Sequence, residues 1–180
     1  MKKHLLLLLT VLPLLALSGC NNDDDNKPAD PISQLPPATQ TGEDTFGCLL
    51  DGKAFLPGPG LNTLDCVYQY VDGGYYFALQ GNKRDSSHNY ILIGCCTQKL
   101  EIFEGEEFDL KEQVDGNAYG SYFYNLNDNT TSITSTGKLK ITKLDFTNHI
   151  VSGTFWFDVM DENGVVHQIR EGRFDMHFTT

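Results

Sequence analysis

The fold is decided by residues 151–178, VSGTFWFDVMDENGVVHQIREGRFDMHF. Large apolar side chains occupy every second position in both halves of this stretch, at Phe155, Phe157 and Val159 and again at Phe174, Met176 and Phe178. A period of two residues is that of a β-strand with one buried face. Glu162-Asn163-Gly164 has the composition of a turn, and Gly172 interrupts the second run as a bulge does. The stretch therefore predicts an antiparallel hairpin with a bulge at Gly172.

The same pattern extends back to Thr45. Turn residues recur at intervals of roughly eight to twelve positions between short runs of β-branched and aromatic residues. Asp51-Gly52, for example, fits a two-residue hairpin turn between two such runs. No segment shows a sustained helical period. Residues 45–180 are therefore predicted to form a single all-β domain, an antiparallel β-sandwich or small β-barrel of about 8–10 strands in a meander-like order.

The N-terminus has the three parts of an export signal. Lys2 and Lys3 supply positive charge, residues 5–17 are almost wholly apolar, and Leu17-Ser18-Gly19-Cys20 ends the run with small residues before a cysteine. The apolar run of about 13 residues is shorter than the roughly 20 that a helix needs to cross a bilayer. Residues 1–19 are therefore predicted to be a signal peptide.

Residues 17–20 resemble the lipobox of bacterial lipoproteins. The resemblance implies cleavage before Cys20 and attachment of lipid to its sulfur, so that the chain's first partner is a membrane. Two or three acyl chains anchor a protein far better than one, since each buried methylene contributes about 0.8 kcal/mol. Residues 20–44 are then predicted to be the lipidated cysteine and a flexible linker, because an acidic, proline-rich segment buries too little surface to fold.

The acidic run Asp23-Asp24-Asp25 resembles the export signal of surface-displayed lipoproteins of Bacteroidota. That resemblance implies a lipid-anchored protein of the outer membrane, displayed at the cell surface. The alternative is a domain that faces the periplasm, with the run as part of an ordinary solvated linker.

The charge balance restricts the choice of partners. The chain has 13 basic and 24 acidic residues, a net charge of −11. The phosphate backbone of nucleic acids binds cationic surfaces, so a chain with this negative net charge is not expected to bind nucleic acid. The charge also suits solubility at a cell surface.

Apart from Cys20, the chain has four cysteines, Cys48, Cys66, Cys95 and Cys96, which are candidates for disulfides in an exported protein. Their spacing lacks the two close pairs typical of a zinc site. Because adjacent strand residues point to opposite faces, Cys95 and Cys96 are not expected to bond to each other. Buried free thiols are the alternative.

The sequence contains no recognisable catalytic or metal-binding motif. The serines lie in polar turns, and no Gly-x-Ser-x-Gly elbow is present. His88, His149, His167 and His177 are scattered, with neither a His-x-His nor a His-Glu-x-x-His pair. Carboxylate pairs for glycoside hydrolysis could be drawn from Glu104, Glu106, Glu107 and Asp109, but such pairs arise by chance in so acidic a chain, and a solvated turn is the favoured interpretation. We predict no metal, no cofactor and no catalytic residue.

Aromatic residues are frequent at the expected strand positions. The candidates for ligand contact are Trp156, Tyr68, Tyr70, Tyr122 and Tyr124, since aromatic rings offer large contact areas at a low entropic cost. The alternative is that the tyrosines simply follow β-propensity. Trp156 falls on the strand face opposite Phe155 and Phe157, so it is either part of a second core layer or exposed for binding.

Residues 137–145 (GKLKITKLD), 151–157 (VSGTFWF) and 171–175 (EGRFD), preceded by LDGKAF at 50–55, form an ordered series of motifs. This series resembles a family of Bacteroidota lipoproteins described as a domain of unknown function, and it covers most of residues 45–178. The motifs consist of turn glycines and core phenylalanines. The resemblance therefore implies a fold and a compartment and no activity.

Three functions are compatible with the sequence. The favoured hypothesis is a non-enzymatic envelope lipoprotein whose β-domain binds a ligand, a glycan or an envelope protein. One alternative is a hydrolase with carboxylate and histidine side chains at strand ends. The other is a purely structural envelope protein with a filled core.

Overall fold

The computed structural model describes residues 30–180. The predicted signal peptide, Cys20 and the first part of the predicted linker lie outside the described residues. The described part has one short 3-10 helix, η1 (Pro31–Gln34), and no helix that is long and apolar enough to span a membrane. Its strands are β1 (Thr45–Leu50), β2 (Lys53–Phe55), β3 (Leu64–Val71), β4 (Gly74–Arg84), β5 (Tyr90–Thr97), β6 (Glu107–Leu110), β7 (Ala118–Tyr124), β8 (Asn127–Thr130), β9 (Gly137–Asp145), β10 (Ile150–Met160) and β11 (Val166–His177).

All eleven of these strands belong to one mixed sheet. Their order is β2-β1-β11-β10-β9-β6-β7-β5-β4-β3, with β8 paired to β7. Neighbouring strands are antiparallel except β6 and β7, which pair in parallel. The prediction of an all-β fold is confirmed, although the sheet has slightly more strands than predicted.

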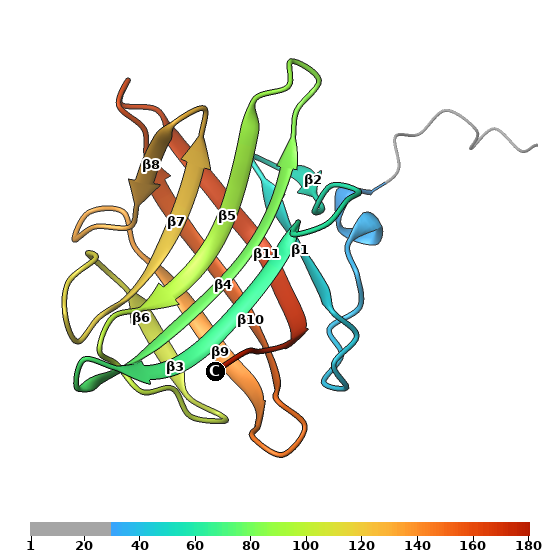
Figure 1. The fold of residues 1–180 in the computed structure, drawn as a ribbon. Coiled ribbons are helices and arrows are strands. Elements are labelled where there is room, and N and C mark those ends of the chain that lie inside the picture. The colour runs from blue at the N-terminus through green and yellow to red at the C-terminus, as the bar shows by residue number, and fades with distance from the viewer. Residues whose placement is uncertain (1–29) are drawn as a thin grey trace, which may run out of the picture.

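The sheet is so strongly curved that the C-terminal residues contact the edge strand β3. β3 is the last strand of the sheet, and the residues just after β11 contact it. The Tyr68 N–H donates to the Thr179 carbonyl (2.8 Å), and the Thr179 N–H donates to the Cys66 carbonyl (3.0 Å). Figure 1 shows the two resulting walls, with β3, β4, β5 and β7 in front of β1, β9, β10 and β11.

Aromatic and aliphatic side chains fill the space between the walls. The rings of Phe77 (β4) and Phe174 (β11) have centroids 6.4 Å apart, and Phe46 (β1) stacks on Phe155 (β10) at 5.4 Å. Burial of each such side chain contributes about 1.5–3 kcal/mol. The largest fully buried side chains come from both walls and their connections: Phe55, Phe77, Phe157, Phe174, Leu79, Ile93, Ile102, Leu110, Leu139, Ile141, Ile169 and Val151. Hydrophobic burial thus joins the two walls into one domain.

β10 and β11 form the predicted hairpin, and the predicted bulge is present. The strand register jumps from Phe155–Gly172 to Phe157–Ile169, which leaves one extra residue on β11. A Cβ atom at Gly172 would lie 2.5 Å from the ring of Phe155. Glycine is needed here because the phenylalanine ring packs directly on the backbone of β11.

Residues 30–44, which we call the N-terminal strap, lie against the domain. Leu35 is buried, and the backbone N–H groups of Thr41, Gly42 and Glu43 donate to the Asp175 carboxylate at 2.9, 2.9 and 3.2 Å. The composition predicted a flexible linker as far as residue 44, and the structure differs over this segment. Backbone amides and one distant carboxylate hold the strap, so its composition gives no sign of the attachment.

The four cysteines in the described part of the chain are free thiols, which is the alternative given above to the candidate disulfides. Cys48, Cys66 and Cys95 are buried in the core, each on a different strand. Cys96 is half-buried on the opposite face of β5, as expected for the neighbour of Cys95. Burial raises the pKa of the Cys95 thiol well above its ordinary value, which makes it a poor nucleophile.

Candidate functional site

The structure does not bring the five predicted aromatic residues together. Tyr68 is only 3% exposed, and its hydroxyl accepts a hydrogen bond from the Ile102 N–H (3.3 Å), so it belongs to the core. Tyr70, on the same strand, is 65% exposed. Tyr122 and Tyr124 stack on each other on β7, with centroids 6.4 Å apart. Trp156 lies separately on the outer face of β10, so the candidate residues fall at two places in the fold.

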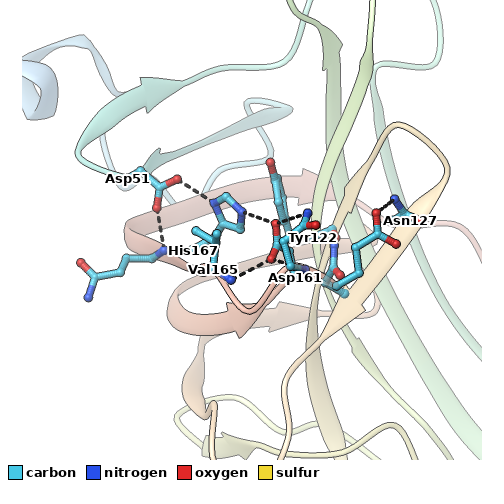
Figure 2. Close-up of polar contacts among 10 residues, drawn as sticks. Asp51, Tyr122, Asn127, Asp161, Val165 and His167 are labelled. Carbon is cyan, nitrogen blue, oxygen red and sulfur yellow. Dashed lines mark hydrogen bonds and ion pairs between the residues drawn. The ribbon is translucent and has the colours of Figure 1, made fainter.

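The first place is the His167 cluster, made of His167, Asp51, Asp161 and Tyr122 (Figure 2). Asp51 comes from the β1–β2 turn and Asp161 from the β10–β11 turn. The Nδ1 atom of His167 lies 2.8 Å from Asp51 Oδ2, and its Nε2 atom lies 3.7 Å from Asp161 Oδ2. The Tyr122 ring lies 4.8 Å from the imidazole, and burial raises the pKa of Tyr122 to about 12. Here a histidine and two carboxylates do meet at strand ends.

The carboxylates of the His167 cluster are engaged in holding turns. Asp51 Oδ1 accepts the backbone N–H of Gln168 (2.8 Å). Asp161 Oδ1 accepts the N–H groups of Val165 (2.8 Å) and Asn163 (2.9 Å), and the bond from Val165 lowers the pKa of Asp161. Both ring nitrogens of His167 face these carboxylates, so neither is directed at a substrate as a general base would be. The cluster is therefore a structural link between the β1–β2 turn and the β10–β11 hairpin.

The second place is the Trp156 groove, on the outer face of β6, β9, β10 and β11. It encloses about 740 Å³, and Ala38 of the N-terminal strap forms part of its border. Its charged lining residues are Glu107, Lys138, Lys140, Arg170, Glu171 and Arg173. Acidic, basic and aromatic side chains therefore meet in this lining, a combination that can bind a polar ligand with an apolar face.

Strand pairing arranges the outward side chains of the groove in two rows. The first row consists of the successive cross-strand partners Glu107, Lys140, Thr154 and Arg173, and the second of Asp109, Lys138 and Trp156. Leu139 and Phe155 lie between the rows and are buried in the core. The alternation of strand faces therefore holds both rows on the outside of the sheet.

Trp156 is 41% exposed and is held in place by Arg170. The guanidinium of Arg170 lies 5.3 Å from the centroid of the Trp156 ring, in a cation–π contact. Arg170 is itself fixed, because Nη2 donates to Asp158 Oδ1 (2.6 Å) and Nη1 to the Phe157 carbonyl (3.0 Å). The indole is thus a preorganised apolar surface, and ordering it on binding costs little entropy.

Ion pairs fix other charged side chains of the groove. Lys138 Nζ lies 2.8 Å from Asp109 Oδ1 and 3.1 Å from Glu107 Oε1. The hydrogen bond between Lys138 and Asp109 lowers the pKa of Asp109 and raises the pKa of Lys138. The exposed indole is therefore surrounded by charged groups in defined positions.

In the described residues 30–180, no group of three or more His, Cys, Asp or Glu side chains is arranged to hold a metal ion.

Comparison of the chain with protein-family models, with curated proteins and with solved structures finds no match. The resemblance to the Bacteroidota lipoprotein family stays a prediction from the sequence motifs.

Sequence reasoning identified Trp156 and missed the charged residues around it. Lys138 and Lys140 come from β9, whereas Arg170 and Arg173 come from β11, on the other side of β10. Alternation along each strand indicates which side chains face outward. It does not give the pairing register or the bulge, which decide that these side chains are neighbours. The one available signal was the concentration of scarce basic residues at 138–140 and 170–173.

Proposed function

We propose that this protein is a saccharide-binding lipoprotein of the outer membrane, anchored through Cys20 and displayed at the cell surface. The observation that carries the binding activity is the half-exposed indole of Trp156, held against Arg170 within a groove of about 740 Å³. The anchor and the compartment rest on residues 1–25 of the sequence.

A saccharide fits the chemistry of the Trp156 groove. A pyranose ring offers an apolar face of C–H groups that complements an indole, and its hydroxyls are both donors and acceptors of hydrogen bonds. Carboxylates, ammonium and guanidinium groups of the two rows are suitable partners for these hydroxyls. Small-molecule sites typically enclose about 300–1,000 Å³. The groove therefore has room for a short oligosaccharide.

A binding function accounts for the site better than a hydrolase does. The His167 cluster combines a histidine with two carboxylates, yet both carboxylates also hold backbone turns and both imidazole nitrogens are engaged. The Trp156 groove, in contrast, exposes a fixed aromatic side chain on a regular sheet. Binding needs such a surface and no proton transfer.

The proposed anchor would keep the groove near the membrane. Nine residues of the sequence, 21–29, lie between Cys20 and Asp30, so the two are ten residue steps apart. Ten residues span at most about 36 Å when fully extended. A domain on so short a tether would meet glycans at the cell surface.

The test is a glycan array probed with the purified full chain, followed by calorimetry on the hits. Replacing Trp156 with Ala should weaken binding at least about tenfold, since a central tryptophan typically contributes 2 kcal/mol or more. Tyr70→Ala is the matched control, because Tyr70 is an exposed aromatic residue on β3, outside the groove, and this variant should bind like the wild type. An array without hits, or a hit with unchanged affinity for Trp156→Ala, would contradict the proposal.

A further inference from the structure

We infer that the Trp156 groove selects acidic saccharides, with the sugar ring on Trp156 and its carboxylate held by Lys140 and Arg173. The inference rests on the proposed function and names the class of ligand. It is carried by the ion pairing in the groove and by the positions of the cations in the first row.

Among the described residues 30–180, Lys140 is the cation of the groove that forms no ion pair. Lys138 contacts Glu107 and Asp109, Arg170 contacts Asp158, and Arg173 contacts Glu171 (3.4 Å). No carboxylate of residues 30–180 lies within 4.0 Å of Lys140 Nζ. Glu107 is the cross-strand partner of Lys140, but its carboxylate lies beside Lys138 instead. The ammonium of Lys140 therefore remains available to an anionic group of a ligand.

The groove also differs in charge from the rest of the molecule. Its lining has four cationic and two acidic residues, and Asp109 and Asp158 add two carboxylates beside Lys138 and Arg170, so the groove is balanced in charge. The whole chain, in contrast, has 13 basic and 24 acidic residues. Fixed charges are screened over about 8 Å at physiological ionic strength. More distant negative charges are therefore largely screened. Within the groove, the ammonium of Lys140, which has no carboxylate of residues 30–180 within 4.0 Å, is the charge that attracts an anionic ligand.

The geometry favours a ring that bears a carboxylate over a free anion. Thr154 stands between Lys140 and Arg173 in the first row, so the Cα atoms of these two cations are about 10 Å apart, two strand spacings. Trp156 lies two residues further along β10 on the same face, about 7 Å from Thr154. A uronate ring stacked on the indole places its carboxylate, or that of the next sugar, beside the two cations. An anion without a ring would use only half of this surface.

Calorimetry with matched ligands tests the inference. Acidic oligosaccharides, such as oligogalacturonate and oligoalginate, are each compared with their methyl esters, which keep the ring and lose the charge. We expect the purified full chain to bind at least one acid ten times more tightly than its ester. Lys140→Gln should remove most of this difference, because it should weaken the binding of the acid far more than that of the ester. Lys53→Gln, at an exposed lysine on β2 outside the groove, is the matched control and should retain the preference.

The outcomes separate this inference from the proposed function. Equal binding of acid and ester, lost in Trp156→Ala, would overturn the acidic preference and leave saccharide binding intact. An acidic preference that survives in Lys140→Gln would overturn the role given to Lys140. Equally tight binding of a simple dicarboxylate such as glutarate would show that charge alone suffices and would overturn the role of the ring. If no saccharide binds at all, the proposed function itself fails.

Discussion

The backbone N–H of Gly42 donates a hydrogen bond of 2.9 Å to Asp175 Oδ1, across 133 residues of sequence. Asp175 is fully buried, and Oδ1 also accepts the Ser152 hydroxyl at 2.7 Å. Burial alone would raise the pKa of Asp175, but the bonds from Ser152 and from the amides of Thr41 and Gly42 outweigh it and lower the pKa to about 2. One carboxylate thus fastens the N-terminal strap to β11.

Replacing Asp175 with Asn should loosen the strap and destabilise the protein. The variant loses charge-assisted bonds to three backbone amides, and we expect a loss of about 2–4 kcal/mol in the free energy of unfolding. Urea denaturation of the full chain measures this change. Asp72→Asn, in the exposed β3–β4 turn, is the control and should be almost neutral. Equal stability of the Asp175 variant and the wild type would show that the carboxylate does not hold the strap.

The low pKa of Asp175 predicts a specific acid sensitivity. Its ordinary value is 3.8 and its folded value about 2, so the unfolded chain binds this proton more readily. Each pKa unit corresponds to about 1.4 kcal/mol, so ionised Asp175 contributes about 2 kcal/mol above pH 4, and this contribution is lost as the pH falls toward 2. The stability difference between wild type and Asp175→Asn should therefore shrink over this range. A difference that stays constant from pH 5 to pH 2 would be inconsistent with the pKa.

His167 should matter for stability and not for ligand binding. The His167→Ala variant removes the contacts with Asp51 and Asp161 that link two turns, at an expected cost of about 1–2 kcal/mol. Thermal unfolding and glycan calorimetry on the same variant provide both measurements. A folded His167→Ala protein that no longer bound the ligand would move the binding site from the Trp156 groove to the His167 cluster.

The sequence predicted those parts of the fold that depend on local pattern. Alternation in residues 151–178 predicted the β10–β11 hairpin, and the position of Gly172 predicted the bulge in β11. Long-range contacts were not predictable. The alternation of residues 173–178 places Asp175 on the polar face of its strand and so predicts that it is exposed. In the structure the N-terminal strap covers it. The number of strands was slightly underestimated, and the parallel pairing of β6 with β7 has no counterpart in a simple meander.

The same distinction applies to the candidate site. The sequence placed Trp156 on the strand face opposite Phe155 and Phe157, either in a second core layer or exposed. In the structure its side chain is exposed. Tyr68 was an equally good candidate from the sequence, since it is also an aromatic residue at a strand position. In the structure its side chain points into the core, where its hydroxyl accepts a hydrogen bond from the Ile102 N–H. Whether an aromatic residue faces a ligand depends on which strand face is covered. That information lies in the sheet topology rather than in the residue type.

The proposed anchor makes a separate prediction about Cys20. Replacing Cys20 with Ala removes the sulfur that would carry the lipid, so the protein should leave the membrane fraction and incorporate no labelled palmitate. Cys96→Ala, at a half-buried thiol of the folded domain, should behave like the wild type in both assays. A processed Cys20→Ala protein that remained in the membrane fraction would contradict lipid anchoring at this residue.

The most direct test of the central claim, that ligands bind on Trp156, uses its fluorescence. The chain contains a single tryptophan, so the intrinsic emission excited at the indole band reports on this one side chain. Titration of the full chain with a saccharide that binds in calorimetry should change the emission saturably, with a midpoint equal to the calorimetric dissociation constant. The same saccharide binding with no change in tryptophan emission would place its site elsewhere on the protein.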